Sequence, residues 1–336
     1  MKAGGSSDAA LSGALTIALL GAAVASMMIG PAGLGPAEIL QGLLDGSGVQ
    51  GLIIREIRLP RLILTLSVGF TLGLSGAVLQ GLLRNPLAEP AVFGAPQAAA
   101  LGAAILLYTG TADAFSWGLP LAAMTGAMAS IALVWLVAGR MRNLVSLLLA
   151  GLAVASLAGA GTALTINLSP NPFAVMEIVF WLMGSFEDRS MRHVAISVPF
   201  MVMACLILLR MGRGLRALTL GEDVAVSLGI NLAALRFIIV LAVAMGVGAG
   251  VAVSGAISFV GLIAPHLVRS FVKGDPARLL LPSALSGALL LLLSDMAVRL
   301  LPSASELKVG VLTVCLGVPF FLWLIASGRM RFGAQT

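Results

Sequence analysis

The chain has 336 residues, of which 59% are hydrophobic and only 10% are charged, and its formal net charge is +6. A soluble domain carries about 25% charged residues, and the mean hydropathy here is +1.07. These values exclude an ordinary soluble protein and predict an integral membrane protein. Because the apolar runs are long and do not alternate with polar residues, they exclude a transmembrane β-barrel and predict an all-α fold.

Uncharged apolar runs recur along the whole chain, each near the ~20 residues that a membrane helix needs. The first is longer than the apolar core of a secretory signal, which is about 7–15 residues, so we interpret it as an uncleaved span. Residues 1–336 are therefore expected to form a single transmembrane domain of about ten helices. The predicted spans are 11–30, 62–83, 91–109, 117–138, 144–166, 193–210, 233–252, 256–272, 279–300 and 310–328.

The basic residues lie mainly at span ends and are unevenly divided between the two sides. Arg84, the stretches 139–143, 210–236 and 269–278, and both tails carry about thirteen Lys and Arg, against about seven on the other side. The positive-inside rule places the richer side, with both termini, in the cytoplasm. This topology explains the isoelectric point near 10.3, so we expect no nucleic-acid partner.

The opposite side receives the stretches 53–61, 166–193 and 301–308. The second of these is long and contains two prolines, Pro170 and Pro172, and an amphipathic part around Trp181. It predicts a short helix that re-enters the membrane or lies on its surface.

The sequence lacks the groups that catalysis or nucleotide binding needs. It has no Gly-x-x-x-x-Gly-Lys-Ser/Thr loop, so this chain is not expected to bind ATP through a P-loop. Its two histidines, His193 and His266, stand far apart at span ends, and both cysteines lie in apolar runs, so no metal site, other cofactor or catalytic residue is predicted. Asp295 lies within a span four residues before Arg299, and pairing along one helix face is the simplest interpretation.

Residues 210–230, RMGRGLRALTLGEDVAVSLGI, form one amphipathic insert in an otherwise apolar chain. The second half predicts a short helix with a glycine before it, acids in its positively polarised first turn and a glycine near its end. One interpretation is a helix lying on the lipid surface, but an anionic leaflet repels its acids. A helix that docks into a cytosolic protein explains both the acids and the apolar face. The residues assigned to it are Gly221, Glu222, Asp223, Gly229 and, on one apolar face, Val224, Ala225 and Leu228.

Several stretches, in order along nearly the whole chain, match one family. They are RLPR (58–61), GLSGAVLQGLLRNPLAEPAVFGAPQAAALGA (73–103), WLMGSF (181–186), LGEDVAVSLGIN (220–231), SGAISFVGLIAPHLVRSFVKGD (254–275) and ELKVGVLTVCLGVPFFLWLI (306–325). On these motifs the chain resembles the FecCD-type membrane permeases of the bacterial type II ATP-binding-cassette (ABC) importers for ferric siderophores, haem and cobalamin.

The resemblance implies a homodimer in the cytoplasmic (inner) membrane, with a translocation path on its axis for an iron chelate of the siderophore type or, alternatively, for cobalamin or haem. It also implies two copies of a cytoplasmic ABC ATPase, which bind ATP and Mg²⁺, and a soluble substrate-binding protein on the outer side. The loop at about 211–232 would then carry the coupling helix that contacts the ATPase. The fifth span borders the path in such permeases, which points to Leu157, Gly161, Leu164 and Leu168.

Arginines on the outer face of these permeases pair with glutamates of the binding protein, and Arg58, Arg61 and Arg299 match their positions. We expect them on an exposed rim, since isolated guanidinium groups suit partner carboxylates. Two departures from the family pattern, Lys308 in place of a frequent proline and the residues at 256 and 258, lie near the outer mouth and leave the cargo open. The turn RNPLAEP (84–90) is interpreted as structural, with an asparagine and a glutamate that can cap helix ends.

A secondary transporter driven by an ion gradient is the alternative from another class. It needs membrane-embedded carboxylates or broken helices near the bilayer midplane, and the spans offer only Asp295 and glycine-rich breaks. An intramembrane enzyme is disfavoured, because the spans hold no constellation of His, Asp and Cys.

Overall fold

The computed structural model describes residues 3–30, 32–44, 46, 48–111, 117–138, 144–301 and 307–327. These residues form helices and turns and no strand, which confirms the all-α prediction. The basic stretch 139–143, residues 302–306 and the C-terminal tail, on which part of the predicted topology rests, lie outside the described residues. The helices are α1 (Ala3–Met28), α2 (Pro36–Leu44), α3 (Gly48–Leu52), the π-helix η1 (Ile53–Arg58), α4 (Leu59–Leu83), the 3₁₀-helix η2 (Pro90–Phe93), α5 (Ala95–Tyr108), α6 (Gly118–Ala138), α7 (Leu144–Leu168), α8 (Pro172–Leu182), α9 (Met191–Arg210), α10 (Gly212–Leu218), α11 (Glu222–Ser227), α12 (Leu232–Ser254), α13 (Val260–Arg269), α14 (Pro276–Leu300) and α15 (Val309–Ala326).

Eight helices in the described part of the chain are long and apolar enough to cross a membrane, and each overlaps a predicted span. The stretch 53–61, predicted as an outer connection, is part of one of these helices. The longest is the continuous helix Gly48–Leu83, which joins α3, η1 and α4 over 36 residues. The two other predicted spans are shorter helices than expected. Within 91–109 the α-helix starts only at Ala95, and within 256–272 it starts only at Val260.

Backbone geometry explains the late start of α13. Gly255 ends α12 with φ +67°, and a Cβ at this position would lie 2.0 Å from the carbonyl oxygen of Trp181. Phe259 then takes a left-handed conformation, with φ +68°, and its N–H donates a 2.7 Å hydrogen bond to the carboxylate of Glu89. The RNPLAEP turn therefore holds the start of α13. Burial raises the pKa of Glu89, and the bond from the Phe259 N–H opposes that rise.

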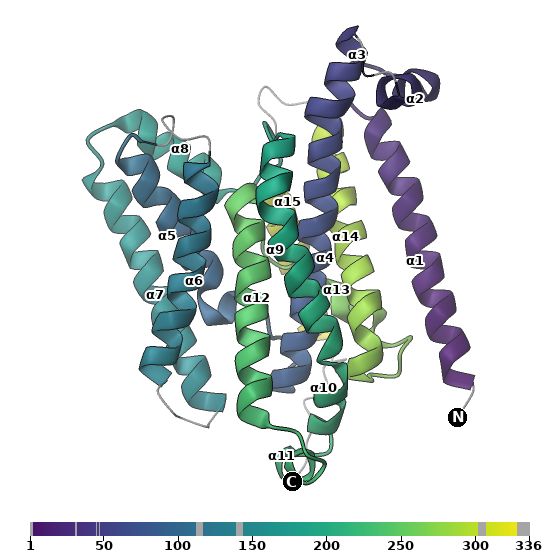
Figure 1. Ribbon diagram of the computed structural model, residues 1–336, viewed down its shortest axis with the longest axis vertical. Helices are drawn as coiled ribbons and strands as arrows, with labels where there is room; N and C mark the ends of the chain where they lie inside the picture. The colour runs from purple at the N-terminus through teal and green to yellow at the C-terminus, as the bar shows by residue number, and fades with distance from the viewer. Residues whose placement is uncertain are drawn as a thin grey trace.

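The helices form an upright bundle whose most buried long members are α4, α12 and α14, while α1 and α7 lie at opposite edges (Figure 1). Helices α2, α3 and α8 lie at one end of the bundle, and α10 and α11 lie at the other. The predicted short helix within 166–193 is α8. It begins where the side chain of Asn171 accepts the N–H of Phe173 at 3.0 Å and Pro172 occupies the first turn.

Small residues bring α4 and α14 into backbone contact. A Cβ on Gly73 would lie 2.2 Å from the carbonyl oxygen of Ser283, and one on Gly287 would lie 2.4 Å from that of Gly69. Gly76, one turn further along α4, faces the carbonyl of Gly261 on α13 in the same way, with a hypothetical Cβ at 1.8 Å. These glycines thus let α4 approach two helices closely.

Replacing Gly73 by Val should destabilise the bundle by about 1–3 kcal/mol or more, because the added side chain overlaps the backbone of α14. The matched control is Gly159→Val in α7, where a Cβ meets nothing within 4 Å. Thermal unfolding of both variants in the same detergent measures the difference. Equal midpoints for the two variants would contradict the close α4–α14 contact.

Candidate functional sites at the two ends of the bundle

Helix α11 is a short helix with a glycine on each side and a salt bridge to α12. Gly221 precedes it with φ +105°, and Gly229 follows it with φ +82°, conformations that glycine adopts without strain. Glu222 in its first turn forms a 2.7 Å salt bridge with Arg236 of α12. Asn231 caps α12 by accepting the N–H of Ala234 at 3.0 Å. The second half of the amphipathic insert predicted at 210–230 is therefore a separate helix anchored on α12.

The apolar surface of α11 differs in part from the predicted face. Val224 and Leu228 are exposed, the latter to 61%, as a docking face requires. Ala225 is fully buried against the bundle, so its assignment to the same face is wrong. Leu220 and Val226 take its place among the exposed apolar side chains. Helix α11 is only six residues long, so the helical spacing used in the prediction extends over less than two turns.

Helix α10 is tied to the start of α14 through Asp275. The Asp275 carboxylate accepts the N–H of Ala277 at 2.9 Å and pairs with Arg216 of α10 at 2.9 Å. Burial alone raises the pKa of this carboxyl group, but the bonds from Arg216, Ala277 and Arg278 outweigh it and lower the pKa below the usual value. Asp275 therefore caps α14 and fixes the helix that leads into α11.

At the opposite end, the three arginines predicted to form an exposed rim are not exposed, and that expectation is wrong: Arg58 is buried, and the side chains of Arg61 and Arg299 are only 13% and 10% exposed. Arg58 is only 6% exposed and donates to the carbonyl of Met27 at the end of α1. Arg299 donates to the carbonyls of Ser26 and Ile29, both at 3.0 Å. These guanidinium groups close the last turn of α1, where helix carbonyls have no intrahelical partner.

Asp295 is the shared counterion of this corner and is 1% exposed. Its Oδ1 lies 2.9 Å from Nη2 of Arg61, and its Oδ2 lies 3.1 Å from Nε of Arg299. The predicted pairing with Arg299 along one helix is confirmed. The contact with Arg61, on a helix 234 residues away in sequence, could not be read from spacing.

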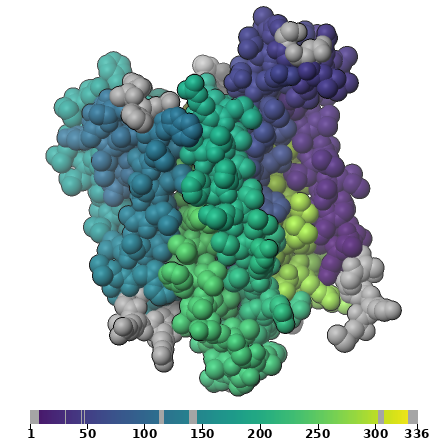
Figure 2. Space-filling view, viewed as in Figure 1, coloured from purple at the N-terminus to yellow at the C-terminus, as the bar shows by residue number. Residues whose placement is uncertain are grey.

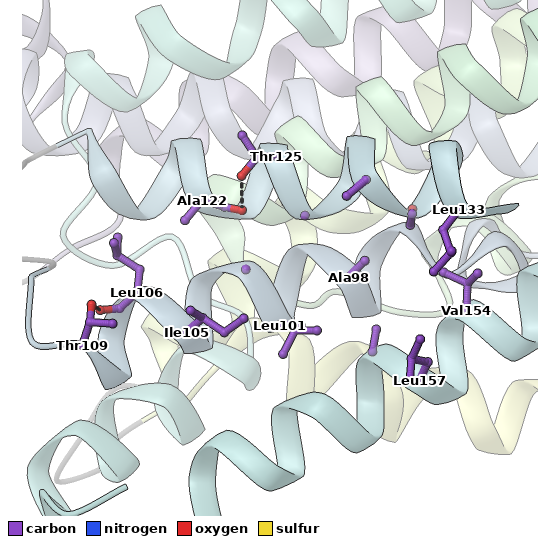
Figure 3. A pocket seen from close by; sticks show the side chains of 15 residues that line it. Ala98, Leu101, Ile105, Leu106, Thr109, Ala122, Thr125, Leu133, Val154 and Leu157 are labelled. Atoms are coloured by element: carbon purple, nitrogen blue, oxygen red, sulfur yellow. Dashed lines mark hydrogen bonds between the residues drawn. The ribbon is translucent and has the colours of Figure 1, made fainter. Parts of the chain in front are cut away.

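The predicted path residues of α7 separate into two environments. Leu157 lines an apolar cavity of about 530 Å³ between α5, α6 and α7, together with Val154 (Figure 3). Gly161 packs against the side chain of Leu101, while Leu164 and Leu168 are exposed on the surface of α7. The four residues therefore share one helix but do not meet in one cavity of this chain.

An ion pair joins the two segments near the predicted outer mouth. Lys308, which stands where the family often has proline, pairs with Glu187 after α8. The N–H of Gly310 donates to the carbonyl of Gly184 at 3.1 Å, which fastens the start of α15 to the same turn. Sequence analysis noted the lysine but missed Glu187, because no local pattern links positions so far apart.

Comparisons with known proteins show the family of this chain. The model of the FecCD transport family matches residues 17–327. The chain belongs to the FecCD transport family. The Fe(3+) dicitrate transport system permease protein FecD of Escherichia coli (strain K12) is 38% identical, over 94% of this chain and 98% of FecD. The vitamin B12 import system permease protein BtuC of Klebsiella pneumoniae is 36% identical, over 94% of this chain and 93% of BtuC.

A solved structure has the same fold. It is described as an inward-facing conformation of an ABC transporter assigned to the metal-chelate type, and it matches with a TM-score of 0.84 at 33% identity, covering 94% of this chain and 98% of the other. The family membership confirms the resemblance found in the sequence and the predicted class of function, a membrane permease of the ABC importers. A FecCD permease spans the membrane several times, in accord with the eight long apolar helices described above.

Asp295→Asn should destabilise this FecCD permease by about 3–5 kcal/mol, because it leaves two buried guanidinium groups without their shared carboxylate. Glu56→Gln, an exposed acid at the same end, is the control and should leave stability unchanged. Thermal unfolding in detergent compares them. A loss no larger in Asp295→Asn than in the control would show that the corner does not depend on this carboxylate.

Proposed function

We propose that the chain is the permease subunit of an ABC importer that moves an iron chelate of the siderophore type across the cytoplasmic membrane. The match to the FecCD family over residues 17–327 carries this proposal. The iron citrate cargo in the name of the FecD relative, together with the metal-chelate type of the matching structure, supports the iron chelate. Cobalamin is the second candidate cargo, because the vitamin B12 permease BtuC is almost equally similar.

The proposed assembly contains two copies of this chain, two cytoplasmic ABC ATPases that bind ATP and Mg²⁺, and an outer substrate-binding protein. The exposed leucine and valine side chains of α11 support ATPase docking at that end. The α11 end, with both termini, would then face the cytoplasm, and the α2–α3 end would face outward. The exposed face of α7 with Leu164 and Leu168 supports a path formed with the second copy.

The three arginines keep a proposed role in binding-protein docking, but not as exposed partners for carboxylates of the binding protein. Arg61 and Arg299 pair with Asp295, and Arg58 donates to the carbonyl of Met27 while its buried Nη2 has no hydrogen-bond partner among the described residues. These arginines would therefore shape the docking corner rather than offer exposed guanidinium groups. Lys308 and Glu187 would lie beside the entrance of the path and contribute charge there.

Energy coupling tests the proposal directly. We expect proteoliposomes that contain the permease and its ATPase, with the binding protein and ferric chelate on the binding-protein side, to accumulate iron only when ATP is supplied on the ATPase side. A proton ionophore should leave this uptake unchanged. Uptake without the ATPase that collapses with the proton gradient would favour the ion-driven secondary transporter instead.

Leu228→Asp should reduce co-purification of the ATPase and chelate uptake at least about tenfold, because a charge replaces an exposed apolar contact of α11. Leu301→Asp, which adds the same charge at the opposite end, is the control and should retain the ATPase. Pull-down of the tagged permease measures both. Normal ATPase recovery with Leu228→Asp would remove α11 from the docking surface.

A further inference from the structure

The cavity of about 530 Å³ between α5, α6 and α7 is an open groove that runs along α5. It belongs to the side of the molecule formed by α5 to α8, at the left of Figure 2. A Cβ on Gly102 of α5 would lie 2.1 Å from the carbonyl oxygen of Ala122, and one on Gly126 of α6 would lie 2.1 Å from that of Ala98. Helices α5 and α6 are thus in backbone contact, and they form a rigid floor for the groove.

The groove offers no unpaired hydroxyl among the described residues that line it. The hydroxyl groups of Thr109, Thr125 and Ser130 donate to carbonyl oxygens of the preceding helical turn, at 2.7, 2.9 and 2.7 Å. The other lining residues are aliphatic or glycine. A polar ligand such as a metal chelate would lose its hydrogen bonds to water here and gain none in return. The occupant of the groove is therefore apolar.

The groove has the length of one lipid leaflet. It extends from Thr109, at the end of α5, to Ala98 near the start of that helix, which is about 16 Å at about 1.5 Å per residue. Half of the hydrocarbon core of a bilayer is about 15 Å. Tyr108 and Trp117 are exposed at the Thr109 end, and such amphipathic rings are typical of the membrane–water interface. The groove therefore descends from one membrane surface to about the midplane.

An open apolar groove at this depth is filled by the lipid around it. Walls without neighbouring atoms lose their dispersion contacts, and the hydrocarbon region holds no water that could take the place of those atoms. An acyl chain is apolar along its length, and its headgroup stays at the membrane surface. There the exposed hydroxyl groups of Thr109 and Thr111 lie 2.8 Å apart. Chain and groove therefore agree in polarity, length and position.

We propose that this groove binds one acyl chain of a phospholipid from the leaflet at the α8 end of the bundle. The bound chain packs against Leu101 of α5 and Leu133 of α6, and it covers Leu157 of α7, which is exposed within the protein chain. It thus supplies contacts that α7 lacks on this side and stabilises α7 against α5 and α6. Leu164 and Leu168 do not line the groove and stay available to the proposed path.

The test is native mass spectrometry of the purified permease in detergent, titrated with 1-palmitoyl-2-oleoyl-phosphatidylethanolamine. The unchanged chain should retain one phospholipid per copy at saturation. Thr125→Phe with Ala129→Phe places two rings in the groove and should raise the Kd at least about tenfold, because the acyl chain then overlaps them. The control is Met128→Phe with Ala132→Phe, at two positions of α6 that are equally exposed but outside the groove, and its Kd should be unchanged. Equal Kd values for the two variants would overturn the proposal.

A second measurement identifies the occupant in lipid nanodiscs, with a phospholipid that carries a diazirine in its acyl chain. Photolabelling of Leu101, in the groove, should saturate at a lower mole fraction of this probe than labelling of Leu121, which is exposed on α6 outside the groove and meets bulk lipid. The same dependence at both positions would refute a specific site. Loss of the Leu101 label on addition of ferric chelate would assign the groove to the cargo. A disulfide between two copies that carry Ala129→Cys, Cys205→Ser and Cys315→Ser would assign it to a second permease. Either result would overturn the proposal.

Discussion

The carboxylate of Asp295 joins three helices at one end of this permease. This carboxylate on α14 can reach Arg61 on α4 because glycines let the two helices run in backbone contact. Its second oxygen pairs with Arg299, and that arginine in turn closes the last turn of α1. Helix α1 lies at an edge of the bundle and buries little of its surface. A single buried acid therefore fixes both the central helix pair and the position of an outer helix, because removing it would leave charges that the interior cannot solvate.

Hydropathy predicted the long spans because a membrane helix must be apolar along its whole length, and all eight long helices coincide with predicted spans. The two shorter spans were predicted at full length because the breaks depend on tertiary contacts. Gly255 ends α12 where the carbonyl of Trp181 leaves no room for a side chain, and Glu89 holds the start of α13 across the bundle. Composition alone carries no information on such contacts.

The candidate sites also depend in part on tertiary contacts that the sequence does not reveal. Spacing identified α11 and its flanking glycines, and it identified the local pair of Asp295 and Arg299, because both are decided within a few residues. Spacing could not show that Ala225 faces inward or that Arg58 and Arg61 are held within the chain, since those facts depend on helices that are distant in sequence. The motif that assigned the arginines to a docking role identifies their positions but not their exposure.

The contacts of α11 decide how a movement at that end can reach α7. Glu222 ties α11 to α12, and Arg216 ties the preceding α10 to α14. Helix α7 instead packs mainly on α5, α6 and η2, each of which also contacts α12. A displacement of α11 is therefore transmitted to α12 directly and to α14 through α10, and it reaches α7 only through the helices between them. Since close-packed helices shift as rigid units rather than deform, α7 would move together with α5 and α6, the helices on which it packs.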